Sequence, residues 1–225
     1  MEKPLNIIAY IHTDFPTKFG IPRQSGLADF EATIVFEPEY RNEEALRGIE
    51  GYSHLWLIWK FSKAERDTWS PTVRPPRLGG NKRMGVFATR SPFRPNPIGL
   101  SSVKLLGVEK TASGCVLHVS GADLMDGTPI YDIKPYLAFT DSHPDAIGGF
   151  ADEKKGYSLK VDFPEEYLAS IPKEKQNALI ELLSEDPRPQ YISDDSREYG
   201  FEFANCEIKF TVQNDTLTVN EVIKK

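Results

Sequence analysis

The sequence contains few of the residues from which cross-links and metal sites are built. Its 225 residues include two cysteines and four histidines, and Cys115 and Cys206 stand far apart with no CxxC pair. Two isolated cysteines with no CxxC pair and no nearby histidine cluster predict neither a disulfide framework nor a zinc site. The scattered histidines predict no metal ion, and the two cysteines are predicted to be free thiols in a reducing cytoplasm.

Long apolar runs are missing as well. No stretch approaches the roughly 20 apolar residues that a membrane-spanning helix needs, and the N-terminus enters a strand-like run without a signal-peptide pattern. The signatures GxGxxG, GxxxxGK[ST], HExxH and GxSxG are also absent. Their absence removes the sequence evidence for a dinucleotide-binding fold, a P-loop, a zinc protease and an α/β-hydrolase. No membrane contact is expected.

The charge is distributed unevenly along the chain. The formal net charge is −6, yet residues 71–108 hold seven basic side chains and no acidic one, whereas residues 144–225 hold ten basic and seventeen acidic ones. Because a polyanion responds to the local field rather than to the net charge, one basic segment can bind nucleic acid on an acidic protein. The seven basic residues are Arg74, Arg77, Lys82, Arg83, Arg90, Arg94 and Lys104.

Short strands joined by turns dominate the predicted N-terminal structure. Seventeen prolines and sixteen glycines disfavour a helical bundle. Residues 52–61 (YSHLWLIWKF) are aromatic or apolar almost throughout, which favours a central strand buried on both faces. Asn42 is a candidate N-cap for a short helix. Further strands are expected over residues 5–11, 31–37, 85–89, 98–108, 115–120 and 130–137.

The composition changes near residue 140. The following stretch is rich in Asp, Gly and Lys and predicts a linker, placed at residues 142–156. Beyond it, residues 173–184 carry apolar side chains at helical spacing, and residues 206–212 alternate as a half-buried strand with a partner at 217–219. The predicted division is therefore a mostly β domain over residues 1–141 and a small α+β domain over residues 157–225.

A dense proline-rich segment lies in the basic part of the chain. Residues 85–101 (GVFATRSPFRPNPIGLS) combine two arginines, three prolines and a glycine near their end. Proline fixes φ, so arginine or backbone groups in such a segment lose little entropy when they bind a ligand. The same pattern fits a rigid structural turn between two strands, and the residues alone leave both interpretations open.

Several motifs together resemble the TsaA-like (TrmO) tRNA methyltransferases. They are the proline-rich segment, FGIPRQSG at 19–26, GYSHLWLI at 51–58, RPPRLGG at 74–80 and DLMDGTPIYDIKPY at 123–136, and DPRPQY at 186–191 with the later YGFEF resembles the bacterial members. The resemblance covers nearly the whole chain. It implies a single-sheet β-barrel and a homodimer. It also implies methyl transfer from S-adenosylmethionine to N6 of threonylcarbamoyl-adenosine at position 37 of tRNA.

The resemblance also implies where the methyl donor binds. The expected contacts are Gln24, Ser25, Gly26, Lys63, Ala64, Arg90, Leu100, Ser120, Gly121, Ala122 and Asp123. S-Adenosylmethionine is a zwitterion, so Arg90 can bind its carboxylate through two parallel hydrogen bonds, and Asp123 can accept from ribose hydroxyls or the amino group. The structural alternatives are a surface ion-pair partner for Arg90 and a turn or cap residue for Asp123.

The basic residues supply the expected contacts to tRNA phosphates and to the threonine carboxylate: Arg74, Arg77, Lys82, Arg83 and Arg94. No residue is singled out as a general base. His54 lies inside the aromatic strand and is interpreted as a hydrogen-bonded core histidine, with a catalytic base as the alternative. A non-catalytic RNA-binding barrel that uses the same basic loop is the second functional hypothesis, and a structural dimerisation module is the third.

Overall fold

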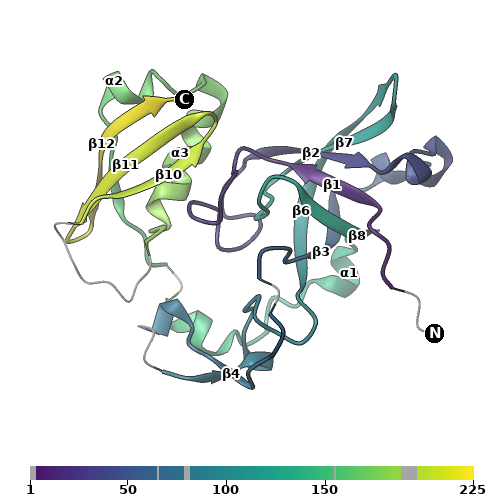
Figure 1. The fold of residues 1–225 in the computed structure, drawn as a ribbon, viewed down its shortest axis with the longest axis horizontal. Helices are drawn as coiled ribbons and strands as arrows, with labels where there is room; N and C mark the ends of the chain where they lie inside the picture. Colours follow the sequence, from purple (N-terminus) through teal and green to yellow (C-terminus); the bar gives the residue numbers. More distant parts are fainter. Residues whose placement is uncertain (1–3, 65, 79–81, 155, 189–196) are drawn as a thin grey trace.

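The computed structural model describes residues 4–64, 66–78, 82–154, 156–188 and 197–225. Six strands close into a barrel in the order β1-β2-β7-β6-β3-β8, and all neighbours in it are antiparallel. Their bounds are Ala9–His12 (β1), Glu31–Phe36 (β2), His54–Lys60 (β3), Ile98–Thr111 (β6), Gly114–Ser120 (β7) and Thr128–Pro135 (β8). Figure 1 shows the barrel beside a second, smaller sheet, which confirms the predicted mostly β architecture.

Alternation of side chains is clear along β2 and β3, where every second residue enters the core of the barrel. Strand β3 buries Leu55, Leu57 and Trp59, while Trp56 and Ile58 between them are only partly buried. Successive residues of a strand point to opposite faces, so one face of each strand supplies the core and the other faces outward. The prediction that residues 52–61 are buried on both faces is therefore wrong, because β3 is one wall of a barrel rather than a strand between two layers.

His54 corrects the sequence interpretation in the same way. It is the first residue of β3 and lies on the outward face, so its side chain is exposed rather than part of the core. Its Nδ1 lies 2.9 Å from the Ser53 hydroxyl, and its ring centroid lies 6.2 Å from that of Tyr136. The predicted hydrogen bond is present, but the predicted burial in the core is wrong.

The segment after residue 85 is a turn rather than the predicted strand. Pairing is limited to Thr72–Val73 (β4) and Met84–Gly85 (β5), and Val86–Ala88 then forms a 3₁₀ turn (η5). The backbone N–H and the hydroxyl of Thr89 both donate to the carbonyl of Val86, at 3.2 and 2.9 Å. Such local side-chain bonds compete with strand pairing, which accounts for the difference.

Short helical turns lie between the barrel strands or follow β8, the last of them. They are Pro38–Tyr40 (η1), Glu43–Leu46 (η2), Ile49–Gly51 (η3), Pro76–Leu78 (η4), Ala138–Asp141 (α1) and Gly149–Lys154 (η6). Asn42 is the N-cap of η2, as predicted, and its side chain accepts from the N–H of Glu44 at 3.0 Å. The capped segment is a 3₁₀ turn rather than an α-helix.

The C-terminal domain is a four-stranded sheet with two helices. The sheet order is β10-β11-β12-β9, with β9 parallel to β12. The bounds are Lys160–Asp162 (β9), Glu165–Leu168 (α2), Lys173–Ser184 (α3), Tyr199–Phe203 (β10), Cys206–Gln213 (β11) and Thr216–Lys224 (β12). Helix α3 has the predicted bounds and buries four apolar residues, Ala178, Leu179, Leu182 and Leu183. Strands β9 and β10 were not predicted.

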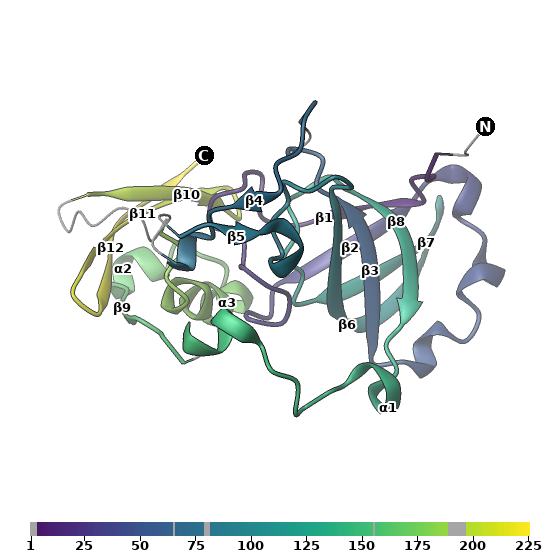
Figure 2. The same cartoon turned by 90° about the horizontal axis from the view of Figure 1, so that it is seen from below.

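The core of this second sheet extends into the first loop of the barrel. Residues 13–30, here called the β1–β2 loop, connect β1 to β2 and lie between the barrel and the C-terminal sheet (Figures 1 and 2). Phe15, Ala28 and Phe30 of this loop belong to the buried cluster formed with α3 and the C-terminal strands, whereas the barrel has its own separate cluster. The loop is therefore shared between the two domains.

Cys115 in β7 and Cys206 in β11 are both buried and free. Within the described ranges, no three His, Cys, Asp or Glu side chains come together in a way that could hold a metal ion. No helix of the described part of the chain is long and apolar enough to cross a membrane.

The contact between Gly99 in β6 and Trp59 in β3 predicts a local stability effect. A Cβ at Gly99 would lie 2.2 Å from Cε2 of Trp59, whereas a Cβ at Gly107 of the same strand would meet nothing within 4 Å. Gly99→Ala should therefore lower the free energy of unfolding by about 1–3 kcal/mol, because overpacking displaces the indole ring. Gly107→Ala is the control and should change it by less than about 0.5 kcal/mol. Equal values in urea denaturation would contradict the predicted packing.

Candidate functional site

A pocket of about 810 Å³ opens where the β1–β2 loop meets the end of β3 and the start of β6. Its size lies within the roughly 300–1,000 Å³ that small-molecule sites occupy. Trp59 and Phe61 stand in its wall with their ring centroids 4.2 Å apart. Seven of the expected donor contacts line it, namely Gln24, Ser25, Lys63, Ala64, Arg90, Leu100 and Asp123.

The other four expected contacts do not line this pocket. The N–H of Gly26 donates to the carbonyl of Gly121 at 2.9 Å, and the N–H of Gly121 donates to the carbonyl of Phe30 at 3.0 Å. Gly121 has a φ of +80°, and a Cβ there would lie 3.4 Å from the backbone of Gly26. Ser120 and Ala122, on either side of Gly121, are buried. These residues tie the β1–β2 loop to the barrel behind the pocket.

Among the described residues that line the pocket, Asp123 is the acidic one, and two buried side chains hold it in place. The indole N–H of Trp59 donates to the Ser101 hydroxyl at 2.9 Å, and that hydroxyl donates to Oδ1 of Asp123 at 2.5 Å. Burial raises the pKa of Asp123 above its ordinary value, although the Ser101 hydrogen bond and the charge of Arg90 act in the opposite direction. Because burial removes water from this carboxylate, it forms strong hydrogen bonds with ligand hydroxyl or amino groups that donate to it.

Arg90 faces Gln24 across the mouth of the pocket. Its Nη1–H donates to Oε1 of Gln24, and the amide nitrogen of Gln24 donates to the carbonyl of Arg23 at 2.5 Å. Arg90 is exposed and makes no ion pair with a described residue. Its guanidinium therefore remains available to an anionic ligand.

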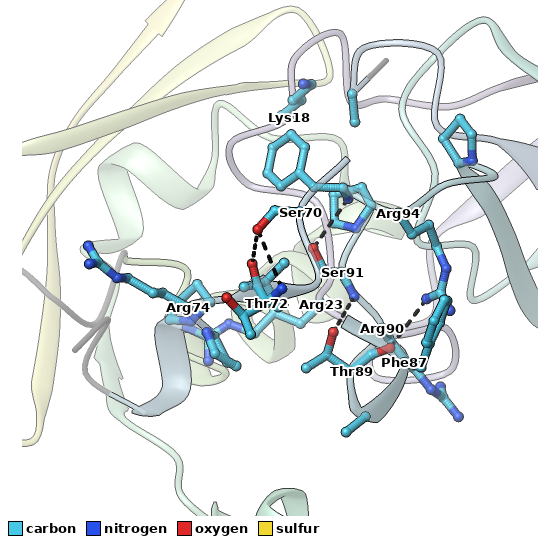
Figure 3. Close-up of a pocket in the computed structure, with 18 of the residues that line it drawn as sticks. Lys18, Arg23, Ser70, Thr72, Arg74, Phe87, Thr89, Arg90, Ser91 and Arg94 are labelled. Atoms are coloured by element: carbon cyan, nitrogen blue, oxygen red, sulfur yellow. Dashed lines mark hydrogen bonds between the residues drawn. The ribbon is translucent and has the colours of Figure 1, made fainter. Parts of the chain in front are cut away.

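A larger groove of about 2,260 Å³ adjoins the pocket, and Arg90 and Arg94 line both. Figure 3 shows Arg74 on one side of this groove and Arg90 and Arg94 on the other. Asp67 is the acidic residue among the described side chains that line the groove. Eight basic residues line the groove: Lys18, Arg23, Arg66, Arg74, Arg83, Arg90, Arg94 and Arg188. Such a surface attracts a polyanion.

The basic residues expected from the sequence are placed in three ways. Arg74, Arg83 and Arg94 line the groove, whereas Lys82 is exposed but does not line it. The side chain of Arg77 lies outside the described part of the structure. Four further basic residues of the groove lie outside the acid-free segment 71–108 and were not predicted from the sequence: Lys18, Arg23, Arg66 and Arg188.

Two family models match the chain. Residues 10–142 match the tRNA-methyltransferase O N-terminal domain, and residues 156–225 match the TrmO C-terminal domain. The chain belongs to the TrmO family. A crystal structure of TrmO from Pseudomonas aeruginosa covers 100% of this chain and 98% of its own, with a TM-score of 0.81 and 33% identity.

Relatives within the TrmO family are similar over most of their length. The tRNA (adenine(37)-N6)-methyltransferase of Escherichia coli is 44% identical over 193 residues, which are 82% of this chain and 81% of that protein. A putative S-adenosylmethionine-dependent methyltransferase of P. aeruginosa, RcsF, is 40% identical over 217 residues, 92% of each chain. A probable S-adenosyl-L-methionine-binding protein of Methanothermobacter thermautotrophicus is 37% identical over 142 residues, 63% of this chain and 96% of that one.

The groove of this TrmO-family chain also carries exposed aromatic side chains, which were not predicted from the sequence as part of the site. Trp69 and Phe87 are 54% and 73% exposed, and their ring centroids lie 6.3 Å apart with 31° between the planes. The guanidinium carbon of Arg66 lies 3.8 Å from the centroid of the Phe93 ring. Exposed aromatic rings beside basic side chains are typical of surfaces that bind single-stranded nucleic acid, because bases stack on the rings while the basic groups bind phosphates.

The raised pKa of Asp123 predicts a dependence of stability on pH. The folded state binds this proton more tightly than the unfolded chain, whose aspartates titrate near about 3.9. The stabilisation from the bound proton is therefore complete below that pH and is lost as the pH rises through the folded-state pKa. Asp123→Asn resembles the protonated form, so its melting temperature relative to the wild type should rise from pH 4 to pH 7.

Asp145→Asn, which removes an exposed carboxyl, controls for the general effect of one negative charge. If the melting-temperature difference for Asp123→Asn is constant or falls over this pH range, burial does not govern the titration of Asp123.

Proposed function

We propose that this protein transfers a methyl group from S-adenosylmethionine to N6 of the threonylcarbamoyl-adenosine at position 37 of tRNA. One observation carries the proposal. A small-molecule pocket lined by Asp123 and Arg90 adjoins a groove that is lined by eight basic side chains among the described residues. The name of the E. coli relative supports the base and its position, and the names of the P. aeruginosa and archaeal relatives support the methyl donor.

The residues of the pocket suit a zwitterionic donor. Arg90 is assigned to its carboxylate and Asp123 to its ribose hydroxyls or amino group. The backbone of Gln24 and Ser25 is assigned to the adenine edge, with Lys63, Ala64 and Leu100 completing the contacts. Gly26 and residues 120–122, which do not line the pocket, are assigned to supporting this segment from behind. When bound, S-adenosylmethionine supplies a methyl group activated on a sulfonium. The chain contributes mainly by holding the acceptor nitrogen in line with that methyl group, because correct positioning supplies much of the rate of a displacement.

The groove is assigned to the anticodon stem and loop. Arg74 and Arg83 make no ion pair with a described residue, so their charges are available to phosphates. Lys82 and Arg77 are assigned to phosphates beside them. Trp69 and Phe87 offer their faces to unpaired bases of the loop. Arg94 is assigned to the threonine carboxylate because, unlike Arg74 and Arg83, it lines both the groove and the pocket.

The proposal includes a homodimer in the cytoplasm and a division into a domain of residues 1–141, a linker of residues 142–156 and a domain of residues 157–225.

The proposed methyl transfer is tested by incubating the purified protein with S-adenosylmethionine and tRNA and measuring nucleosides by mass spectrometry. One added methyl group on threonylcarbamoyl-adenosine, and none on tRNA from a strain that lacks this modification, is the expected result. Binding of tRNA without methylation would instead support a non-catalytic RNA-binding barrel.

Arg90→Ala should weaken binding of S-adenosylmethionine by about 1.5–3 kcal/mol, the usual contribution of a hydrogen bond to a charged group. The substitution should leave the fold intact because the side chain is exposed. Titration calorimetry measures the affinity. Arg47→Ala, which removes an exposed arginine that lines neither the pocket nor the groove, is the control. An unchanged affinity in a folded Arg90→Ala protein would remove Arg90 from the donor site.

The groove predicts two distinguishable effects on tRNA binding. The Arg74→Ala, Arg83→Ala variant should bind tRNA more weakly and reduce the slope of log affinity against log salt by roughly 1.4–1.8, since each lost phosphate contact removes about 0.7–0.9. Trp69→Ala should weaken binding by roughly 1–3 kcal/mol but keep the slope, because stacking releases no counterions. Melting temperature and donor affinity should be unchanged in both variants.

Lys209→Ala, Lys225→Ala is the control for the groove, because these lysines form ion pairs on the C-terminal sheet and line neither the groove nor the pocket. A filter-binding salt series in which the groove variants match this control would place the tRNA-binding face elsewhere.

A further inference from the structure

The β1–β2 loop contains Gln24, Ser25 and Gly26 but buries its aromatic side chains in the other domain. The ring centroids of Phe15 and Phe30 lie 5.5 and 5.0 Å from that of Phe203 in β10, and 5.0 Å from each other. All three side chains are nearly inaccessible to solvent. Separation of the C-terminal sheet from the loop would therefore expose three aromatic rings.

The middle of the loop packs against the same strand. The ring of Phe19 meets that of Phe201 edge-on, with 6.2 Å between the centroids. Gly20 has a φ of +91°, and a Cβ there would lie 2.3 Å from the ring of Phe201. This approach is so close that only glycine fits, and it fixes the backbone four residues before Gln24. Phe201 itself lines neither the pocket nor the groove.

Polar contacts fix the residue directly before Gln24. The Nη2 group of Arg23 donates to the carbonyl of Asp186 and, at 3.3 Å, to that of Arg188. The carboxylate of Asp186 is itself buried and accepts from Nε of Arg188 at 2.8 Å and from the hydroxyl of Tyr157 at 3.1 Å. These carbonyl groups therefore belong to a rigid turn at the end of α3.

An ion pair adds a further contact near the start of the loop. Nζ of Lys175 in α3 lies 2.5 Å from Oδ2 of Asp14, and both side chains are partly buried. On the other side, the barrel holds the loop by hydrogen bonds from the N–H of Ser102 to the hydroxyl of Ser25 and from the N–H of Gly26 to Gly121. Residues 23–26 thus run between one anchor in each domain.

We propose that the C-terminal domain holds residues 23–26 in the conformation that binds the methyl donor, and that Phe201 is a positioning residue for donor binding. The inference rests on the proposed function of the pocket. A loop that must be ordered when the donor binds has an apparent dissociation constant equal to the intrinsic one divided by the fraction already ordered. Loss of the Phe201 contact lowers that fraction, because free backbone residues gain conformational entropy.

The test compares Phe201→Leu with Phe210→Leu in the full-length protein. Both substitutions remove a ring from the same buried cluster. Phe210, however, lies on the next strand, β11, and its ring contacts those of Tyr199 and Phe201 and no ring of the β1–β2 loop among the described aromatic contacts. Both variants should therefore be less stable to urea. Only Phe201→Leu should raise the dissociation constant for S-adenosylmethionine, by about tenfold, which corresponds to about 1.4 kcal/mol.

Two further readouts separate positioning from general damage. Phe201→Leu should raise the KM for S-adenosylmethionine and leave kcat at saturating donor near the wild-type value. Amide hydrogen exchange of residues 19–26 in the donor-free protein should become faster in this variant and remain unchanged in Phe210→Leu.

A milder pair keeps the test valid if a phenylalanine variant does not fold. Lys175→Met breaks the ion pair to the loop, and Lys209→Met breaks a similar pair to Glu221 at 2.8 Å within the C-terminal sheet. About threefold weaker donor binding is expected for the first and no change for the second. If the loop-facing variants bind the donor as tightly as their controls, the positioning role is overturned. If the wild-type protein does not bind S-adenosylmethionine, the proposed function itself fails.

Discussion

The burial of the β1–β2 loop in the core of the C-terminal domain is the constraint on which the site depends. A fully buried large apolar side chain contributes roughly 1.5–3 kcal/mol, and this loop places both Phe15 and Phe30 against Phe203. The same loop is bonded to the barrel through Gly26 and Gly121. One segment therefore joins two hydrophobic cores, and the pocket lies where it passes from one to the other.

The electrostatics of the molecule follow from the same arrangement. The chain carries a net charge of −6, yet the groove brings basic side chains from the β1–β2 loop, from residues 66–94 and from Arg188 to one surface. Because the local field decides where a polyanion binds, this concentration of positive charge outweighs the overall acidity. The acidic C-terminal half supplies Arg188 to the groove and backbone carbonyls to Arg23.

The sequence predicted the helices and strands whose conformation depends mainly on the spacing of apolar residues along the chain. Helix α3 was predicted over its full length because apolar residues at helical spacing and the following Asp186-Pro187 define its face and its end. All six barrel strands were also predicted near their observed positions, whereas the additional strand predicted over residues 85–89 is a turn.

Features that depend on long-range pairing were not visible in the sequence. Ser101 reaches Trp59 because β3 and β6 pair in a register that places Leu57 opposite Ser101 and Trp59 opposite Gly99. Arg23 donates to the backbone of Asp186, which is 163 positions away in the sequence.

The most direct test of the pocket is hydrogen exchange with and without S-adenosylmethionine. Simultaneous protection of residues 21–26, 60–64, 98–102 and 120–123 is predicted, whereas protection of only one of these segments, or of none, would contradict a donor site built from all four.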